Sequence, residues 1–427
     1  MKVAIIGSGI SGLSAAYAMR KTHDVHVFEA EGHPGGHAHT VTVLDGDRDV
    51  SIDTGFIVYN ETTYPGFTAL LKDLGVETMA TEMSFGMSCA THDLEYSSRG
   101  LAGMLAHPTA MATPSRARMI WEIRKFYRHS KELLSKYSKT NTSLGEFLEE
   151  GNYGVEFRRH FLVPLVGSIW STPATGVLDY PARYLFEFLH NHGLLSTTGR
   201  LLWRSVVGGS RRYVDKLVRQ LPNGVRVNSP IRKIYRHSDG ITVIPWAGLP
   251  QEFDHIVLAT HADESLRLLA GATSLERQAL SELVYKPSRV VLHTDSKVMP
   301  TRRRAWAGWN YVAYPCTEDA GFVSISYHMN RLQGLNALND YFVSVNPTDL
   351  ISPDQIITEF DYAHPQYSAS TQQAQVRLRS INGANRTHFA GAFLGHGFHE
   401  DGFQAGLNVA VQLATARSPQ FPREVAV

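Results

Sequence analysis

Cysteine is almost absent from this 427-residue chain, and its charges nearly balance. The two cysteines, Cys89 and Cys316, exclude a disulfide scaffold and any CxxC zinc or redox motif, and they fit a reducing compartment. The 41 Lys and Arg residues against 40 Asp and Glu residues leave a net charge of +1, without the basic excess that is typical of nucleic-acid-binding proteins. We therefore expect no nucleic-acid partner.

Long hydrophobic runs are also missing. The apolar stretch at residues 3–6 is too short for the core of a signal peptide, and no run reaches the roughly 18 apolar residues of a membrane span. HExxH, P-loop and GxSxG motifs are absent, so metalloprotease, nucleoside triphosphatase and hydrolase functions have no support. The length and the 43% hydrophobic content predict a cytoplasmic, folded protein of two or three domains.

The most informative segment covers residues 2–29. A short apolar strand (residues 3–6) is followed by the sequence GSGISG at residues 7–12, a helix-forming run, a second strand at residues 25–28, and Glu29. This is the strand–GxGxxG–helix–strand–acid order of a dinucleotide-binding unit. Its glycines make the tight turn, let the backbone approach a pyrophosphate, and let the helix pack on the strand. The acid would bind the adenosine ribose, which disfavours NADP and leaves NAD and FAD open.

A glycine pair after this unit points to FAD. Residues 29–40 contain Gly35 and Gly36, and here the sequence resembles the flavin-containing amine oxidase and phytoene desaturase superfamily, in which arginines flank the pair. In this chain His33 and His37 stand at the arginine positions. A neutral imidazole can donate a hydrogen bond to a phosphate but brings no fixed charge. These two histidines and His39 lie in a loop without cysteine or carboxylate partners, so we predict no metal site.

Later segments carry the same resemblance. Residues 53–56 (DTGF) resemble the turn that passes beside the flavin ring, residues 228–231 (NSPI) resemble the strand that brackets the adenine, and residues 254–260 resemble a strand returning to the nucleotide domain. Residues 388–402 resemble the closing strand and loop, followed by a helix expected over 403–413. In the superfamily this helix directs its N-terminus at the flavin, where it stabilises negative charge. Many relatives carry an acid where this chain has Ala392.

The resemblance implies a set of site residues. For proton handling it and the sequence suggest Tyr59, His396, His399 and Glu400. For cofactor binding it implies Gly7, Gly9, Ile10, Ser11, Gly12, Glu29, Ala30, Gly35, Gly36, His37, Gly55, Phe56, Ile57, Ile231, Ala259, Thr260, Gly391, Ala392, Asp401, Gly402 and Phe403. Because the C-terminal motif lacks the cysteine that links flavin in some relatives, we expect non-covalent FAD.

The predicted fold is α/β, with a Rossmann-type FAD-binding domain and an interleaved α+β substrate domain. The resemblance implies residues 1–75, 200–265 and 375–427 for the first and 76–199 and 266–374 for the second. Within the second domain, residues 114–139 have the apolar spacing of a helix. The opposite side of this helix has eight basic residues and only two acidic ones, Glu122 and Glu132. This basic face is either solvated or a contact for a membrane surface or an acyl carrier, peripheral to the inner face of the membrane.

Substrate hypotheses remain open at this point. Amine oxidases of the superfamily place a lysine near the flavin, but the matching segment, residues 285–293, has an apolar residue there, with Lys286 and Arg289 only nearby. Residues 53–60, 259–263 and 397–402 together resemble a narrower branch that includes the flavoprotein portion of plant cyclopropane fatty-acid synthases. We therefore favour dehydrogenation or isomerisation of an apolar fatty-acyl or lipid substrate over oxidation of a soluble amine, a structural flavin, or an NAD-dependent dehydrogenase.

Overall fold

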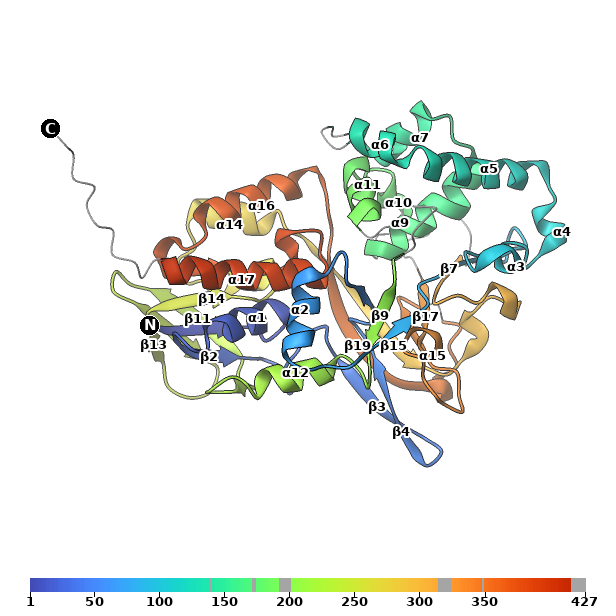
Figure 1. Cartoon of the computed structure of the whole chain (residues 1–427). Coiled ribbons are helices and arrows are strands. Elements are labelled where there is room, and N and C mark those ends of the chain that lie inside the picture. Colours follow the sequence, from blue (N-terminus) through green and yellow to red (C-terminus); the bar gives the residue numbers. More distant parts are fainter. Residues whose placement is uncertain are drawn as a thin grey trace. The chain divides into compact units, whose positions relative to one another are not determined.

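The chain forms two compact units, which we describe separately. The computed structural model describes residues 1–137, 140, 142–170, 174–191, 201–313, 324–347 and 349–415. The first unit consists of Met1–Ala38, Tyr213–Leu283 and Gln373–Val427, and the second of His39–Arg212 and Val284–Gln372. Helices and sheets occur in both (Figure 1), so the predicted α/β class is confirmed.

The first unit is built on a five-stranded, wholly parallel sheet in the order β10-β2-β1-β14-β20. Its central strand is apolar from residue 3 to residue 6, and residues 3–5 have no exposed surface. The strands are β1 (Lys2–Ile6), β2 (Asp24–Phe28), β10 (Val225–Arg226), β14 (His255–Leu258) and β20 (Thr387–Phe389), with a separate antiparallel sheet of β11 (Ile231–Arg236), β12 (Ile241–Pro245) and β13 (Gln251–Phe253). The helices are α1 (Ile10–Met19), α12 (Arg211–Val218), α13 (Ala262–Leu268), α14 (Ser274–Ser281), α16 (Ala369–Ile381) and α17 (His399–Thr415).

The two ends of the chain meet in this unit. Helix α17, red in Figure 1, packs along helix α1, blue, which follows the first strand. A Cβ atom on Gly402 would lie 2.8 Å from the side chain of Ile10, and one on Gly406 would lie 2.2 Å from the carbonyl oxygen of Ser11. Only glycine permits this approach, so the close contact of the two helices follows from the sequence of α17.

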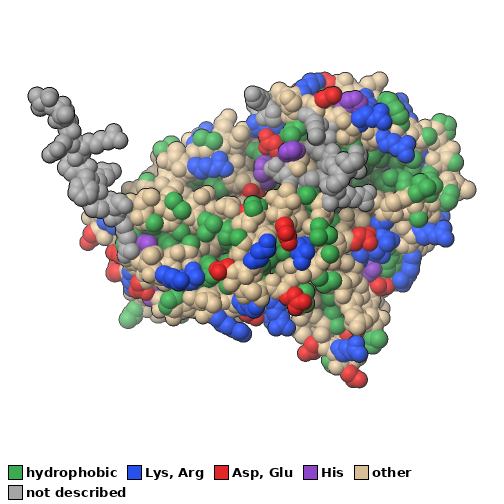
Figure 2. Space-filling model, viewed as in Figure 1, with side chains coloured by type: hydrophobic (Ala, Val, Ile, Leu, Met, Phe, Trp, Pro, Cys, Tyr) green, Lys and Arg blue, Asp and Glu red, His purple; other side chains and the backbone are tan. Residues whose placement is uncertain are grey.

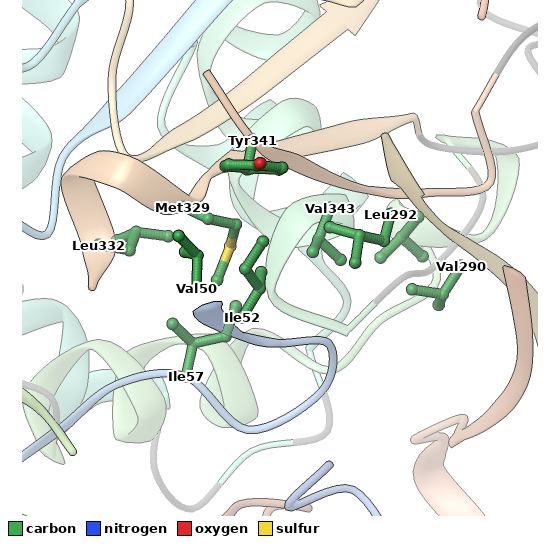
Figure 3. Packing of buried hydrophobic residues seen from close by; sticks show 10 residues of the cluster. Val50, Ile52, Ile57, Val290, Leu292, Met329, Leu332, Tyr341 and Val343 are labelled. Carbon is green, nitrogen blue, oxygen red and sulfur yellow. The ribbon is translucent and has the colours of Figure 1, made fainter. Parts of the chain in front are cut away.

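The second unit contains a seven-stranded sheet in the order β19-β15-β18-β17-β16-β7-β8. Its strands are β7 (Phe85–Cys89), β8 (Leu94–Ser97), β15 (Tyr285–His293), β16 (Trp309–Ala313), β17 (Ile325–His328), β18 (Phe342–Val345) and β19 (Ile356–Pro365). Smaller sheets pair β3 (Thr40–Asp45) with β4 (Arg48–Asp53), and β9 (Trp203–Val206) with β5 (Tyr59–Asn60) and β6 (Thr78–Thr81). Figure 3 shows the apolar cluster in which Val290 and Leu292 lie with Ile52, Ile57 and Met329.

Short helices make up the rest of the second unit. They are α2 (Pro65–Asp73), α3 (Gly100–Met104), α4 (Pro108–Met111), α5 (Pro114–Arg128), α6 (Ser130–Tyr137), α7 (Leu144–Glu150), α8 (Val155–Phe157), α9 (Val163–Trp170), α10 (Ala174–Val177), α11 (Ala182–Asn191) and α15 (Met329–Leu332), with a π-helical turn at Arg158–Leu162. Buried aromatic rings fill the space among them, and Phe126 contacts Phe147, Phe157 and Phe186. The apolar segment 161–170 begins in the same region, where Phe161 contacts Phe126 and Tyr127.

Two predicted helices have different bounds in the structure. The expected helix over 114–139 is two helices, because the chain turns at His129, whose ring nitrogen also hydrogen-bonds the Lys125 carbonyl at 2.9 Å; residues 138–139 lie outside the description. Glu122, expected on the charged face, is buried and accepts from Arg118 and from Gly154 N. The C-terminal helix begins at His399 rather than at residue 403.

The two units do not coincide with the predicted domains. Residues 39–75 and 201–212, assigned by resemblance to the FAD-binding domain, belong by packing to the second unit, and residues 266–283 belong to the first. Hydrogen bonds explain the first shift, since Asp53 binds Ser210 and Gln333 of the second unit. Helix α14 packs on α13, which explains the other. A division by packing does not test roles, so the functional division stays a prediction.

Candidate functional site

The turn after β1 has the geometry of a pyrophosphate cradle. Gly7 has a φ of +97°, and a Cβ there would lie 2.8 Å from the carbonyl oxygen of Ala259. A Cβ on Gly12 would lie 2.0 Å from the carbonyl oxygen of Gly7, whereas one on Gly9 would meet nothing within 4 Å. Gly7 and Gly12 are therefore required by the fold, and Gly9 leaves open space beside the backbone. No side chain caps the first turn of α1, so its N–H groups can face an anion.

The end of β2 lies beside this turn. Glu29 Oε2 accepts hydrogen bonds from Ser8 N at 2.9 Å and Ser8 Oγ at 2.5 Å. The loop before β11 joins the same place, because Ser229 N donates to the Glu29 carbonyl at 2.7 Å and Asn228 N donates to the Glu31 carbonyl at 2.9 Å. Glu29 and Ala30 thus lie next to the loop that leads into the predicted adenine-side strand, which starts at Ile231. Ser8, which sequence reasoning did not single out, connects the acid to the turn.

The glycine pair forms the other wall. Gly35 N donates to the Ser8 carbonyl at 3.0 Å, and Gly36, with a φ of +55°, comes so close that a Cβ on it would lie 3.2 Å from Gly9 Cα. His37 follows, with its ring 6.2 Å from that of His261 between centroids. The strand end at Ala259 and Thr260 completes this side, since Ala259 N donates to the Ile6 carbonyl. The two glycine turns, which are separated by 22 residues in the sequence, are therefore in contact.

The C-terminal loop is held by two polar side chains, one buried and one partly buried. Gln375, on α16, donates from Nε2 to the carbonyls of Phe393 at 2.8 Å and Gly395 at 2.7 Å. Asp401 accepts from the amides of His396 at 3.0 Å and Phe398 at 2.9 Å. A carboxylate in the first turn of α17 also suits the positive end of the helix. The side chains of Asp401 and Gln375 therefore both fix the loop. The role of Gln375 could not be predicted from the sequence, because no motif contains it.

His399 is paired with a tyrosine of the same unit. Tyr213 Oη and His399 Nε2 are 2.8 Å apart, and burial, together with the neighbouring His37, lowers the pKa of His399 to about 3. The imidazole is thus neutral at neutral pH, and its Nε2 shares a hydrogen bond with the Tyr213 hydroxyl. Glu400 accepts from Gln404 Nε2 at 2.6 Å. The predicted proton-handling roles of His396, His399 and Glu400 stay predictions.

The remaining predicted residues lie in the second unit. The Asp53 carboxylate is fully buried and accepts from Thr40 Oγ1 at 2.6 Å, from Ser210 N and Oγ at 2.8 Å each, and from Gln333 Nε2 at 3.0 Å. Burial raises the pKa of Asp53 to about 6, although the hydrogen bonds from Thr40 and Ser210 lower it. This network fixes the start of the segment that contains Gly55 and Phe56.

The side chains of Phe56, Ile57 and Tyr59 pack against other side chains of the second unit. Ile57 lies in the apolar cluster of Figure 3, and Phe56 packs edge-on against Phe67. Tyr59 is 2% exposed, with its ring against Phe67 and Tyr64. Any contact of this segment with a cofactor would therefore be made mainly by its backbone. The predicted role of Tyr59 in proton handling stays untested.

Comparison with known proteins gives the family. The sequence model described as "Flavin containing amine oxidoreductase" matches residues 10–360. The chain belongs to this family. Its members are FAD-dependent oxidoreductases that generally bind the cofactor without a covalent link. Three features of the first unit fit FAD: the open space beside Gly9, the N-terminus of α1 that no side chain caps, and Glu29 at the end of β2. Residues 391–403 contain no cysteine that could attach the flavin.

Relatives and solved structures agree with this family. A proposed flavin-containing monoamine oxidase of Mycobacterium tuberculosis, AofH, is 24% identical over 256 residues, which are 56% of this chain and 53% of the relative. The chain thus matches about half the length of that curated relative. Among solved structures, a fatty acid isomerase of P. acnes that produces CLA has a TM-score of 0.69 at 15% identity, covering 96% of this chain and 98% of the other. Putrescine oxidase bound to putrescine has a TM-score of 0.70 at 14% identity, covering 97% and 99%. These likenesses show the fold.

Proposed function

We propose that this protein is an FAD-dependent oxidoreductase that dehydrogenates or isomerises an apolar fatty-acyl or lipid substrate. The observation that supports an apolar substrate is strand β15. Its cationic side chains, Lys286 and Arg289, are exposed, and Arg289 is bound to Glu359 at 2.7 Å. Its buried side chains include Val290 and Leu292, which lie in the apolar cluster with Ile57. The strand therefore offers no buried lysine of the kind that the amine oxidases of the superfamily place near the flavin.

The chain's own residues have limited but definite roles in this proposal. When FAD is bound, it supplies the chemistry by accepting two electrons from the substrate. The N-terminal turn would hold the diphosphate, and the C-terminal loop, fixed by Gln375 and Asp401, would hold the backbone of residues 391–398 in place. His399 is neutral, so it would donate or accept hydrogen bonds rather than supply a charge. Specificity would then depend on shape and apolar contact.

The proposal can be tested with the flavin as the reporter. Dehydrogenation of a fatty-acyl substrate should bleach the flavin absorbance under anaerobic conditions, whereas isomerisation should change the double-bond pattern of the product without net bleaching. Both are measured on the same samples, by absorbance and by gas chromatography of the extracted acyl chains. Putrescine and cyclohexylamine are the matched amine substrates. Bleaching by the amines, with every acyl chain recovered unchanged, would contradict the apolar-substrate proposal.

Oxidation of a soluble amine is the second candidate. It is favoured by the matching region of the proposed monoamine oxidase and by the amine oxidases among the similar structures, which include cyclohexylamine oxidase from Brevibacterium oxydans (TM-score 0.69, 17% identity, 97% of this chain and 99% of that chain). A structural flavin in a partner of a lipid-modifying enzyme is the third. The resemblance to the flavoprotein portion of plant cyclopropane fatty-acid synthases supports this third candidate at the level of sequence motifs.

The basic helix pair α5–α6 supports a further proposal, contact with a membrane surface or an acyl carrier. Arg124 and Arg128 are exposed, and Trp121 is 60% exposed on the same helix. Other basic residues serve the fold, since Lys125 donates to the Gly151 carbonyl and Lys136 pairs with Glu150 at 2.6 Å. Figure 2 shows blue Lys and Arg side chains beside green apolar ones on the visible face of the part that carries these helices. Among the described helices, none has the length and apolar character to cross a membrane.

A further inference from the structure

A cluster of three metal-binding side chains lies in the second unit and contains none of the residues named above for FAD. Cys89 ends strand β7, His92 lies in the turn to β8, and His160 comes from the π-helical turn Arg158–Leu162. Their donor atoms all lie within 4.8 Å of one another. Cys89 and His160 are completely buried, and His92 is partly buried. No metal site was predicted from the sequence, and these residues were not considered there, since 67 residues separate the third side chain from the Cys-x-x-His pair.

The backbone directs these side chains inward. The β7–β8 hairpin reverses through Asp93, whose φ of 46° lets the turn close, so Cys89 and His92 lie on the same side of it. The π-helical turn is a rare local structure that occurs often at functional sites. Its carbonyl at His160 accepts from the buried Tyr96 hydroxyl at 2.6 Å, which anchors the turn to β8.

A carboxylate orients the third side chain. His160 Nδ1 is 2.7 Å from Glu156 Oε2, one helical turn earlier, so Nδ1 carries the hydrogen and Nε2 presents a lone pair. Nε2 points at the cluster, 3.3 Å from His92 Nδ1. A carboxylate on the distal nitrogen of a histidine is the usual support of zinc-binding imidazoles, because it fixes the tautomer and raises the basicity of the ligand.

The distances match a tetrahedral ion. With Zn–N near 2.05 Å and Zn–S near 2.3 Å, two nitrogens of a tetrahedron lie about 3.3 Å apart and a nitrogen and a sulfur about 3.6 Å apart. His92 Nδ1 is 3.3 Å from His160 Nε2 and 3.2 Å from Cys89 Sγ. Two of the three edges of the ligand triangle therefore need to change by only a few tenths of an ångström. The third, from Cys89 to His160, lies within 4.8 Å.

We propose that Cys89, His92 and His160 bind one Zn²⁺ ion, with Glu156 as the positioning residue of His160. Sulfur and imidazole donors in tetrahedral geometry select zinc over magnesium or calcium. Three protein ligands leave the fourth position for water or a small anion. On binding, the Cys89 thiol loses its proton to solvent and its sulfur bonds to the metal, so the affinity rises with pH. The proposal is independent of the flavin.

Two cations lie beside His92: Arg116 donates to its carbonyl oxygen, and Arg159 opposes the metal at its ring. Arg159 Nη1 lies 3.5 Å from His92 Nε2 and favours the tautomer with hydrogen on Nδ1. Zinc at Nδ1 requires the opposite tautomer, so the guanidinium has to withdraw when the ion binds. Removing this charge in R159Q should therefore tighten zinc binding. Weaker binding in R159Q would contradict the tautomer assignment and the proposal with it.

The test measures zinc in the full-length, FAD-loaded protein. After growth with added zinc and dialysis against metal-free buffer, mass spectrometry should find one zinc per chain, and X-ray absorption should show one sulfur near 2.3 Å and two nitrogens near 2.05 Å. C89S and H160N should lose the zinc, and E156Q should weaken its binding by about 10- to 100-fold. H237N is the matched control, because the exposed His237 lies in the first unit, bonds Thr242 Oγ1 at 2.8 Å and is not part of the cluster.

Folding is checked separately from metal binding. Each variant must keep its flavin and a single thermal transition, and zinc should raise the melting temperature of the wild type but not of C89S. Should C89S prove unstable, E156Q and R159Q still report on the site, since they are expected to change the affinity in opposite directions. Only trace zinc in the wild type, unchanged zinc in C89S and H160N, or an absorption spectrum without sulfur would overturn the proposal.

Discussion

Replacing Gly9 with alanine should separate cofactor binding from folding. A Cβ there meets no atom within 4 Å, and Gly9 has a φ of −65°, which alanine adopts freely. The free energy of unfolding of the protein without cofactor should therefore change by less than about 0.5 kcal/mol, as for an ordinary surface substitution. If the diphosphate passes beside Gly9, the new methyl group enters its space. Overpacking of this kind costs about 1–3 kcal/mol, which is a weakening of FAD binding by about 5- to 150-fold.

Two further glycines provide the controls. Gly12→Ala places its Cβ 2.0 Å from the backbone oxygen of Gly7, which cannot move aside, so this variant should be destabilised by about 1–3 kcal/mol or more. Gly271→Ala also meets nothing within 4 Å but lies in the loop between α13 and α14, and it should change neither quantity. Denaturant unfolding without cofactor gives the stabilities, and fluorescence titration with FAD gives the affinities. Wild-type FAD affinity in Gly9→Ala would refute the placement of the diphosphate.

Three other predictions follow from buried or exposed polar groups. Burial raises the pKa of Asp53 from 3.8 to about 6, so its contribution to the free energy of unfolding is present at low pH and falls by about 1 kcal/mol between about pH 5 and pH 7. Asp53→Asn should lose that fall in paired denaturant titrations, and an identical pH dependence in both proteins would exclude the raised pKa. Gln375→Leu leaves two carbonyls without their donor and should cost about 1–3 kcal/mol, whereas the exposed Gln373→Leu on the same helix should be neutral by thermal unfolding. Charge reversal at Arg124 and Arg128 should weaken sedimentation with anionic liposomes by about 1 kcal/mol per charge, and unchanged sedimentation would remove the membrane proposal.

The nucleotide half of the site could be read from the sequence because its parts are local. The spacing of Gly7, Gly9 and Gly12 between two apolar strands indicates one turn geometry, and strands β1 and β2 and helix α1 formed where the pattern predicted. The glycines at 402 and 406 lie opposite α1 for the same steric reason. Their role as a packing face was nevertheless missed, because it depends on a helix that lies almost 400 residues earlier in the chain.

The rest depends on contacts between distant segments. Gln375 and Tyr213 belong to no motif, and only the fold brings them to the C-terminal loop and to His399. The break at His129 is a change of backbone angles to a φ of −95° and a ψ of 8°, which apolar spacing does not reveal. The Cys89-x-x-His92 pair was visible, but nothing in the sequence identified His160 as its neighbour. Long-range geometry of this kind requires the structure.

The most direct test of the central claim is the flavin content of the purified protein. We predict a yellow protein that carries one FAD per chain, and acid precipitation should release the flavin intact into the supernatant, where chromatography identifies it as FAD. A colourless protein that cannot be reconstituted with FAD would contradict the account. Flavin that stays with the precipitated chain would contradict non-covalent binding.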